Sequence, residues 1–398
     1  MTQLELSKEG RDSLLQFLSA LVQTPSPSGK ESAVAALVID EMRRLGYDEV
    51  WMDAAGNVLG RIGSPSGPVL MLDSHMDTVD VADPQAWSVD PYGAVVTDGH
   101  LYGVGACDMK GGLAASVYGA ALLGGLRERL SGSILVACVG LKEPSEGTCS
   151  QACIEELGTR PDWVVIPEPS NLHVVRAQRG HLEMVLTVKG RSAHSSTPEL
   201  GINAVYAAAR VIFGLEILAG QLMTDPFLGP GVLAVTEIMS HGASRNTLPD
   251  RCELFLDRRL TVGETEAMSL LEVQRVIARE GVDAAVRVLE HDIATHTGKM
   301  LHARRTSLPW ALEERHPLVQ AMLQAARSVG LRPTITCWPY ATEGAYTAGV
   351  ARIPTVGFGP GDPGLSHRSN EHVDVNQVYA AANAYAALAG KLLGAASE

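Results

Sequence analysis

Short apolar runs alternate with amphipathic stretches through the first 180 residues of the chain. The stretches 7–23 and 30–45 repeat apolar positions at helical spacing, and the turn sequence TPSPSG separates them. A helix of small residues is expected from about 111 to 125. Four runs are apolar at nearly every position, which is typical of strands buried on both faces: 57–62, 68–75, 131–140 and 162–168. This alternation predicts an α/β fold.

The pattern changes near residue 180, where a strand, a helix, two strands, a helix and a strand follow one another. This βαββαβ order is that of a ferredoxin-like unit. The segments are 181–190, 203–218, 231–239, 251–260, 265–280 and 283–291. After about residue 295 the α/β pattern returns, with a helix at 315–329, short strands at 333–337 and 355–359, and an alanine-rich C-terminal helix.

We therefore predict a mixed-sheet domain of α/β/α layers, formed by residues 1–179 and 295–398. A ferredoxin-like βαββαβ domain is expected as an insertion at 180–294. Two domains suit a chain of 398 residues, which is too long for one ordinary core.

The charge balance narrows the choice of partner. The net charge is −13, and no window clusters lysine and arginine as phosphate binding requires, so a nucleic-acid partner is not expected. No apolar run of about 18 residues predicts a membrane span, and the first residues carry acids where a signal peptide has its apolar core. We expect a cytoplasmic protein with a small-molecule partner. The six cysteines show no disulfide framework.

Polar residues of metal-binding type stand where the predicted strands end. His75 and Asp77 are two apart at the end of 68–75, so both side chains can point to the same side, and Asp77 can hold the second nitrogen of His75. Asp108 follows Gly103 and Gly105, and a carboxylate flanked by glycines can approach a metal closely. A histidine in a surface turn and an aspartate capping a helix are the ordinary alternatives for these positions.

Three further segments of the chain complete the set. Glu143 and Glu146 follow the strand 131–140, and Glu168 follows an apolar strand between two prolines. His367 lies in a loop rich in glycine and proline. A carboxylate at the end of a buried strand needs a compensating charge. Two histidines and three carboxylates at separate strand ends are the ligand stock of a co-catalytic zinc pair.

Other enzyme classes are poorly supported. The sequence has no H-E-x-x-H, and the glycine loop GVGACD has Asp108 where a dinucleotide-binding loop has its third glycine. No serine is at the centre of a G-x-S-x-G motif, so a serine hydrolase is not expected.

The spacing of these residues resembles that of the zinc peptidase family containing carboxypeptidase G, aminoacylase, acetylornithine deacetylase and succinyl-diaminopimelate desuccinylase. The resemblance covers essentially the whole chain, and the closing GFGPG and SHRSNE motifs carry it most specifically. The segments KEPSEGTC and GRSAHSS look closest to the branch of selenium-metabolism-linked hydrolases. The matching positions are His75 and Asp77 (H-x-D), Asp108, Lys142 and Glu143 (the acidic pair), Glu168 and His367.

By this resemblance, Asp108 bridges two zinc ions per chain, for which cobalt or manganese can substitute. His75 and Glu168 hold one ion and Glu143 and His367 the other, while Asp77 orients His75. The bound ions polarise an amide carbonyl and activate a shared water. The implied substrate is an N-acyl amino acid or a dipeptide-like amide.

The resemblance also gives a role to the inserted domain, as a lid through which two chains form a homodimer. His194, in GRSAHSS, then stabilises the oxyanion from the partner subunit. Asn246, in GASRNTLPD, and Arg259, in the D-R-R at 257–259, hold the substrate carboxylate.

Lys142 departs from the family pattern. The first glutamate of the family's acidic pair is the general base, and here that position is a lysine, which accepts a proton only when it is neutral. Glu146, three residues further on, is a possible substitute. Two functions therefore stay open: a hydrolase that works despite Lys142, and a catalytically inactive zinc protein that binds the same kind of ligand.

Overall fold

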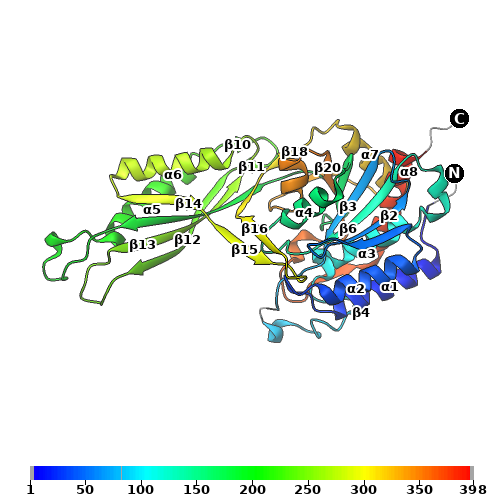
Figure 1. Cartoon of the computed structure of the whole chain (residues 1–398), viewed down its shortest axis with the longest axis horizontal. Helices are drawn as coiled ribbons and strands as arrows, with labels where there is room; N and C mark the ends of the chain where they lie inside the picture. Colours follow the sequence, from blue (N-terminus) through cyan, green and yellow to red (C-terminus); the bar gives the residue numbers. More distant parts are fainter. Residues whose placement is uncertain (1–3, 82, 395–398) are drawn as a thin grey trace.

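The computed structural model describes residues 4–81 and 83–394 of the chain. Figure 1 shows an elongated molecule with a broad part that carries both chain ends and a narrower part that projects from it. We call the broad part the large domain, and the elements from β9 to β17 the small domain.

The large domain is built on a mixed sheet, to which nine strands of the described ranges contribute. β3, β6, β7 and β20 run parallel at its centre, and antiparallel strands flank them. All seven residues of β3 and of β6 are buried, as expected for strands covered on both faces. The sheet order is β1 (Glu49–Met52), β2 (Val58–Gly63), β6 (Ser133–Val139), β3 (Val69–His75), β7 (Trp163–Ile166), β20 (Thr355–Gly357), β8 (Val174–Gln178) and β18 (Trp310–Ala311), and β19 (Ile335–Trp338) pairs with β8.

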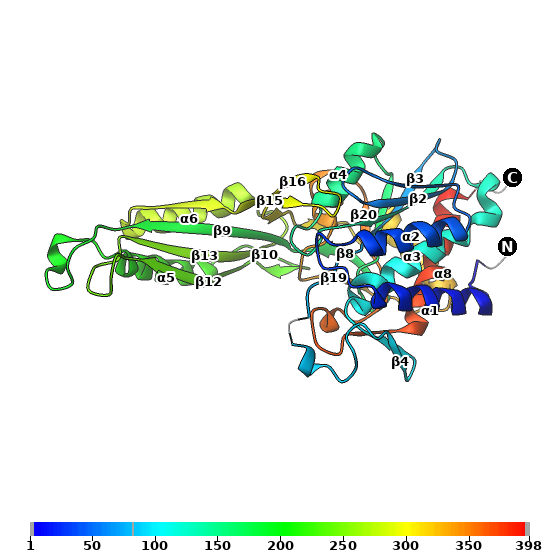
Figure 2. The ribbon, with the colours of Figure 1, turned by 60° about the horizontal axis from the view of Figure 1, so that its bottom comes forward.

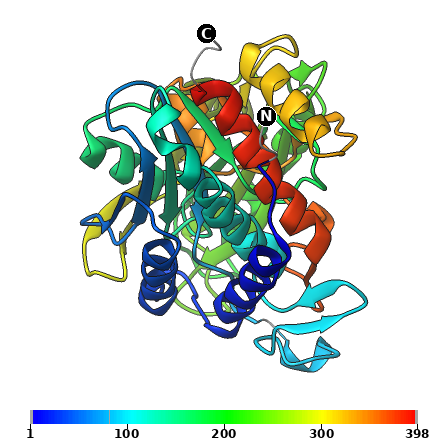
Figure 3. The same cartoon turned by 90° about the vertical axis from the view of Figure 1, so that its right-hand side faces the viewer.

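Helices cover both faces of this sheet. One core joins one face to α1 (Lys8–Gln23), α2 (Ser32–Arg44), α3 (Gly111–Ala121), α7 (Pro317–Ser328) and α8 (Val375–Leu393). α1, α2 and α8 are visible in the end-on view of Figure 3, in blue and red. A second core joins the other face to α4 (Thr148–Leu157). The predicted α/β class with a mixed sheet is confirmed. No helix within the described ranges is both long and apolar enough to cross a lipid bilayer.

The small domain has its own antiparallel sheet and its own core. Burial alternates residue by residue along β13, because α5 and α6 pack on one face of the sheet only. In Figure 2, β9 and β13 extend lengthwise away from the large domain. In chain order the elements are β9 (Gly180–Lys189), α5 (Ala204–Ala219), β12 (Val232–His241), β13 (Arg251–Leu260), α6 (Glu266–Glu280) and β14 (Ala284–Val288), and the sheet order is β12-β13-β9-β14.

Two neighbouring chain segments connect the domains. β8 ends at Gln178 and β9 begins at Gly180. On the return, β17 (Thr306–Ser307) pairs with β9, and β18 pairs with β8, where Trp310 lies opposite Gln178. The chain therefore leaves and re-joins the large sheet on adjacent antiparallel strands. Between β14 and β17 lies a hairpin of β15 (Glu290–Ala294) and β16 (Met300–Arg304), and β10 (Thr224–Asp225) and β11 (Gly229–Pro230) form a short ribbon.

Candidate metal centre

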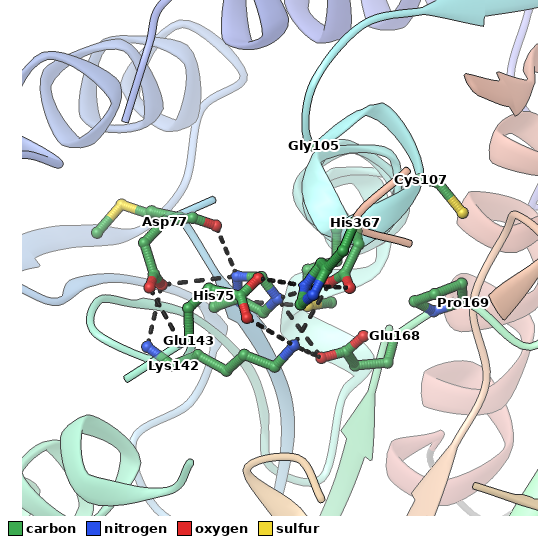
Figure 4. A network of polar contacts seen from close by, with 12 residues as sticks. His75, Asp77, Gly105, Cys107, Lys142, Glu143, Glu168, Pro169 and His367 are labelled. Carbon is green, nitrogen blue, oxygen red and sulfur yellow. Dashed lines mark hydrogen bonds and ion pairs between the residues drawn. The ribbon is translucent and has the colours of Figure 1, made fainter. Parts of the chain in front are cut away.

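Three of the predicted residues are brought together by the parallel strands. β3 lies between β6 and β7 and runs parallel to both, so their carboxyl ends meet at one edge of the sheet. His75 is the last residue of β3, Glu143 follows β6 and Glu168 follows β7. Figure 4 shows these side chains converging, together with that of His367.

Asp108 reaches the same place from a separate loop. A three-stranded sheet of β4 (Val95–Thr97), β5 (His100–Tyr102) and β21 (His372–Asp374) lays the loop after β5 beside the segment that ends in Glu371. The buried Glu371 carboxylate accepts hydrogen bonds from the backbone N–H groups of Gly105, Cys107 and Asp108 at 2.9–3.1 Å. Burial raises the pKa of Glu371 to about 8. The Asp108–Met109 peptide bond is cis.

The five side chains form two triads that share Asp108. One is His75, Asp108 and Glu168; the other is Asp108, Glu143 and His367; within each, one ligand atom per residue lies within 4.8 Å of the others. His75 Nε2 is 3.1 Å from Asp108 Oδ1, and His367 Nε2 is 3.5 Å from the other oxygen, Oδ2. Each oxygen of Asp108 thus faces a different histidine, as a bridging carboxylate requires.

His75 presents the nitrogen that a metal needs. Its Nδ1–H donates to the backbone carbonyl of Asp77 at 2.9 Å, so Nε2 faces Asp108 and Glu168. The Asp77 carboxylate is 3.6 Å from Nδ1 and accepts hydrogen bonds from the backbone N–H groups of Lys142 and Glu143, both at 3.1 Å. Asp77 therefore holds His75 mainly through its carbonyl, and its carboxylate positions the loop after β6.

The Lys142 side chain points into the same cluster. It is 6% exposed, and its Nζ lies 3.0 Å from Glu168 Oε1, 3.5 Å from Asp108 Oδ1 and 3.8 Å from Glu143 Oε2. Burial lowers the pKa of the ammonium, but the surrounding carboxylates outweigh burial and hold the pKa well above its usual range. In return, Lys142 and His75 hold the pKa of the buried Asp108 well below its usual range.

The donor set fits two divalent cations. Each triad offers one imidazole nitrogen and carboxylate oxygens, which suit zinc and related metals. Glu168 is fully buried, and neither of its oxygens has a hydrogen-bond partner among residues 4–81 and 83–394; its contacts are the ion pairs with His75 and Lys142. A buried carboxylate in this state is stabilised by a bound cation.

The three residues expected to touch the substrate lie in the small domain and outside this cluster. His194 and Asn246 are exposed and adjoin each other, since Ser195 N–H donates to the Asn246 carbonyl at 2.8 Å. Both follow the end of a strand that points away from the large domain, as Figure 1 shows, and β9 alone spans about 33 Å over its ten residues. Arg259, on β13, is paired with Asp257 at 2.8 and 2.9 Å.

Glu146 points to the connection between the domains. Its carboxylate accepts a hydrogen bond from Ser307 at 3.1 Å and lies 3.8 Å from His181 Nδ1. His181 also contacts Asp257 and Glu183 of the small domain. Burial lowers the pKa of His181, but Asp257 and Glu146 raise it more, to about 9. Sequence patterns did not identify His181 or the role of Glu371, although Glu371 belongs to the SHRSNE motif.

Two histidines and two glutamates around one shared aspartate, with three of these side chains at the strand ends of an α/β/α sheet, are typical of the class of metal-dependent hydrolases. Residues 71–391 match Peptidase family M20/M25/M40. The chain is 35% identical to the uncharacterized protein YgeY of Escherichia coli strain K12 over 387 residues, which covers 97% of this chain and 96% of YgeY. The chain belongs to this peptidase family and is a metal-dependent hydrolase, as the resemblance implied.

Solved structures show the same fold at low sequence identity. A metallo-carboxypeptidase of the M20 family, Sso-CP2 from Sulfolobus solfataricus, matches with a TM-score of 0.74 at 18% identity, over 95% of this chain and 98% of that one. The Bacillus subtilis protein YXEP, a dinuclear metal-binding peptidase of the M20 family, matches with a TM-score of 0.69 at 17% identity, over 97% and 99% of the two chains.

Proposed function

We propose that this protein hydrolyses the amide bond of an N-acyl amino acid or a dipeptide-like substrate, with two zinc ions per chain for which cobalt or manganese can substitute. The pair of triads that share Asp108 supports the proposal most directly. His75 and Glu168 would hold one ion, and Glu143 and His367 would hold the other. When bound, the ions would supply Lewis-acid chemistry, which polarises a carbonyl and lowers the pKa of a bound water.

The other candidate residues of the site position the metal ligands and bind the substrate. Asp77 fixes the tautomer of His75 and the position of Glu143 through the contacts described above. Arg259 binds the substrate carboxylate together with Asn246 of a second subunit, a task for which the forked guanidinium of arginine is suited. His194 of a second subunit donates a hydrogen bond to the oxyanion. His194 lies in the loop after β9, a strand that extends away from the large domain, and this supports its action on the partner's centre rather than on its own.

The surface of the small domain supports a homodimer. On α5, Tyr206, Phe213 and Ile217 are 70%, 66% and 55% exposed. The edge strand β12 adds the exposed Val232 and Ile238. Exposed aromatic and aliphatic side chains beside an unpaired strand edge are typical of a protein–protein interface.

A second function rests on one residue. A charged Lys142 stands where a general base is needed, and its ammonium has no lone pair with which to accept a proton. A protein of this kind retains the metals and the ligand but does not turn the ligand over. The second candidate is therefore an inactive homologue that binds N-acyl amino acids.

Metal content and a substrate panel test the proposal together. Purified protein that has never met a chelator is expected to carry close to two zinc ions per chain by elemental analysis, and to cleave at least one member of a panel of N-acyl amino acids and dipeptides. Asp108→Ala should lose most of the metal and about 10³-fold or more in rate, because both ions share this ligand.

The exposed Asp40, on α2, gives the matched control, since Asp40→Ala removes a carboxylate elsewhere. A metal content near zero or one at neutral pH contradicts the two-metal centre. Full metal content with ligand binding and no turnover on any amide selects the inactive homologue.

A further inference from the structure

The Lys142 ammonium lies on one side of the metal centre. Its contacts at 3.0 and 3.5 Å are with Glu168 Oε1 and Asp108 Oδ1. His75 Nε2 faces the same two oxygens, at 3.4 and 3.1 Å. The ammonium therefore occupies the environment of the triad of His75, Asp108 and Glu168, and contacts two of its three ligands.

The other triad uses different oxygen atoms. His367 Nε2 faces Asp108 Oδ2 at 3.5 Å and Glu143 Oε1 at 3.1 Å. The contact that Lys142 makes with Glu143 is with the second oxygen, Oε2, and is longer, at 3.8 Å. The donor atoms that His367 faces are thus distinct from those that Lys142 contacts.

An ammonium in this position competes with a divalent cation. Both are attracted to Glu168 and Asp108, and they repel each other at contact distance in a region that water barely reaches, since Glu168 is fully buried and Lys142 is 6% exposed. The backbone of Lys142 is fixed by its N–H, which donates to Asp77 Oδ1 at 3.1 Å. A divalent cation therefore binds beside Glu168 only if the flexible lysine side chain rotates away from Glu168.

We propose that the Lys142 ammonium and a divalent cation compete for the site formed by His75, Asp108 and Glu168, so that the two metals bind in two unequal steps. The first ion binds at Asp108, Glu143 and His367. The second ion binds only as Lys142 leaves Glu168. This inference rests on the two-metal centre of the proposed function. It adds that the two ions bind in a fixed order and with unequal affinities.

Zinc titration of the metal-free full-length protein tests the order. Calorimetry with Zn²⁺, and elemental analysis after dialysis against fixed free Zn²⁺, should resolve a tight and a weak step in the native protein. Lys142→Met removes the charge and keeps the length of the side chain, and it should strengthen the weak step by roughly 10–100-fold, a usual range for coupling between two ligands. The tight step should stay within about threefold.

Four further variants test the result more closely. Lys189→Met, at the exposed end of β9, removes a lysine charge elsewhere and should leave both steps unchanged. Glu168→Gln should abolish the weak step alone, and His367→Ala should weaken the tight step. Lys142→Gln repeats the test of charge with a second neutral side chain, and circular dichroism shows that each variant is folded.

Two equal steps in the native protein, or a weak step that both neutral Lys142 variants leave unchanged, overturn the competition while leaving the two-metal centre intact. Failure of native protein and Lys142→Met alike to bind any Zn²⁺ overturns the proposed function as well. A weak step in the native protein that both Lys142→Met and Lys142→Gln strengthen supports the competition.

Discussion

The large and the small domain hold their candidate functional residues in opposite ways. In the large domain, buried charged groups gather at the ends of three parallel strands and contact one another at 3.0–3.8 Å. In the small domain, His194 and Asn246 are exposed at loops beyond the far strand ends, and their contacts are with neighbouring loop residues.

The two domains therefore place their candidate functional residues by different structural means. Parallel strands bring His75, Glu143 and Glu168 to one sheet edge, and loops of the same domain add Asp108 and His367, so the large domain alone supplies all five candidate metal ligands. The small domain presents single side chains in the loops after β9 and β12, and β9, about 33 Å long, extends away from that centre. Residues placed in this way contribute to catalysis only if a second copy of the chain brings them there.

The largest effect is expected inside the large domain, at Lys142. Lys142→Glu supplies the missing general base and should raise turnover by roughly 10²–10⁴-fold, because this is the usual contribution of a positioned base. Steady-state rates at saturating zinc measure the effect with the same metal content in both proteins.

The competing account of the missing base gives the opposite pattern. If Glu146 acts as base, Glu146→Gln abolishes activity and Lys142→Glu gains little. The hydrogen bond from Ser307 and the ion pair with His181 support a structural role for Glu146 instead. If the rates of both variants are unchanged, the protein is the inactive homologue that binds the ligand without cleaving it.

The next effect tests whether the small domain works in trans. Subunits with His194→Ala and subunits with Asp108→Ala should each be nearly inactive alone. An equal mixture should recover about a quarter of the parental activity, because half of the randomly formed dimers are mixed and each has one intact site. The Lys142→Glu background can provide the activity needed for the assay.

A monomeric protein in solution, or no recovery after verified subunit exchange, contradicts this arrangement. Sedimentation and the mixing assay therefore have to agree.

The smallest effect concerns the support of the bridging aspartate. Glu371→Gln leaves one carboxyl oxygen where two accept hydrogen bonds from three backbone N–H groups, so the loop of Asp108 loses part of its support. Zinc affinity should fall by about 10–100-fold, as for other residues that hold a metal ligand in place. Equilibrium dialysis measures the change, and Glu128→Gln, at an exposed carboxylate, should have no effect.

The sequence predicts best what local pattern encodes. Continuous apolar runs identified the strands, and the polar residues after them identified His75, Glu143 and Glu168 as candidates. The role of Glu371 was not predicted because its hydrogen-bond partners are 263 to 266 residues away, and no local sequence pattern reports such distant contacts. His181 was not identified because two of its partners, Glu146 and Asp257, come from other segments of the chain.

The sequence showed that Lys142 departs from the family pattern, but it did not show which residues the Lys142 side chain contacts. The direction of a long flexible side chain depends on the charges around it, and here Glu168, Asp108 and Glu143 come from three different segments. The roles of His194, Asn246 and Arg259 came from the family resemblance alone, and they remain predictions.

The pairing of Gln178 with Trp310 makes the small domain, in topological terms, the enlarged loop of a β-hairpin. A protein engineer could close that hairpin with a short turn, because the two strand ends already lie side by side. The shortened chain would retain every strand that carries a candidate metal ligand, so metal binding would become separable from any contribution of the small domain.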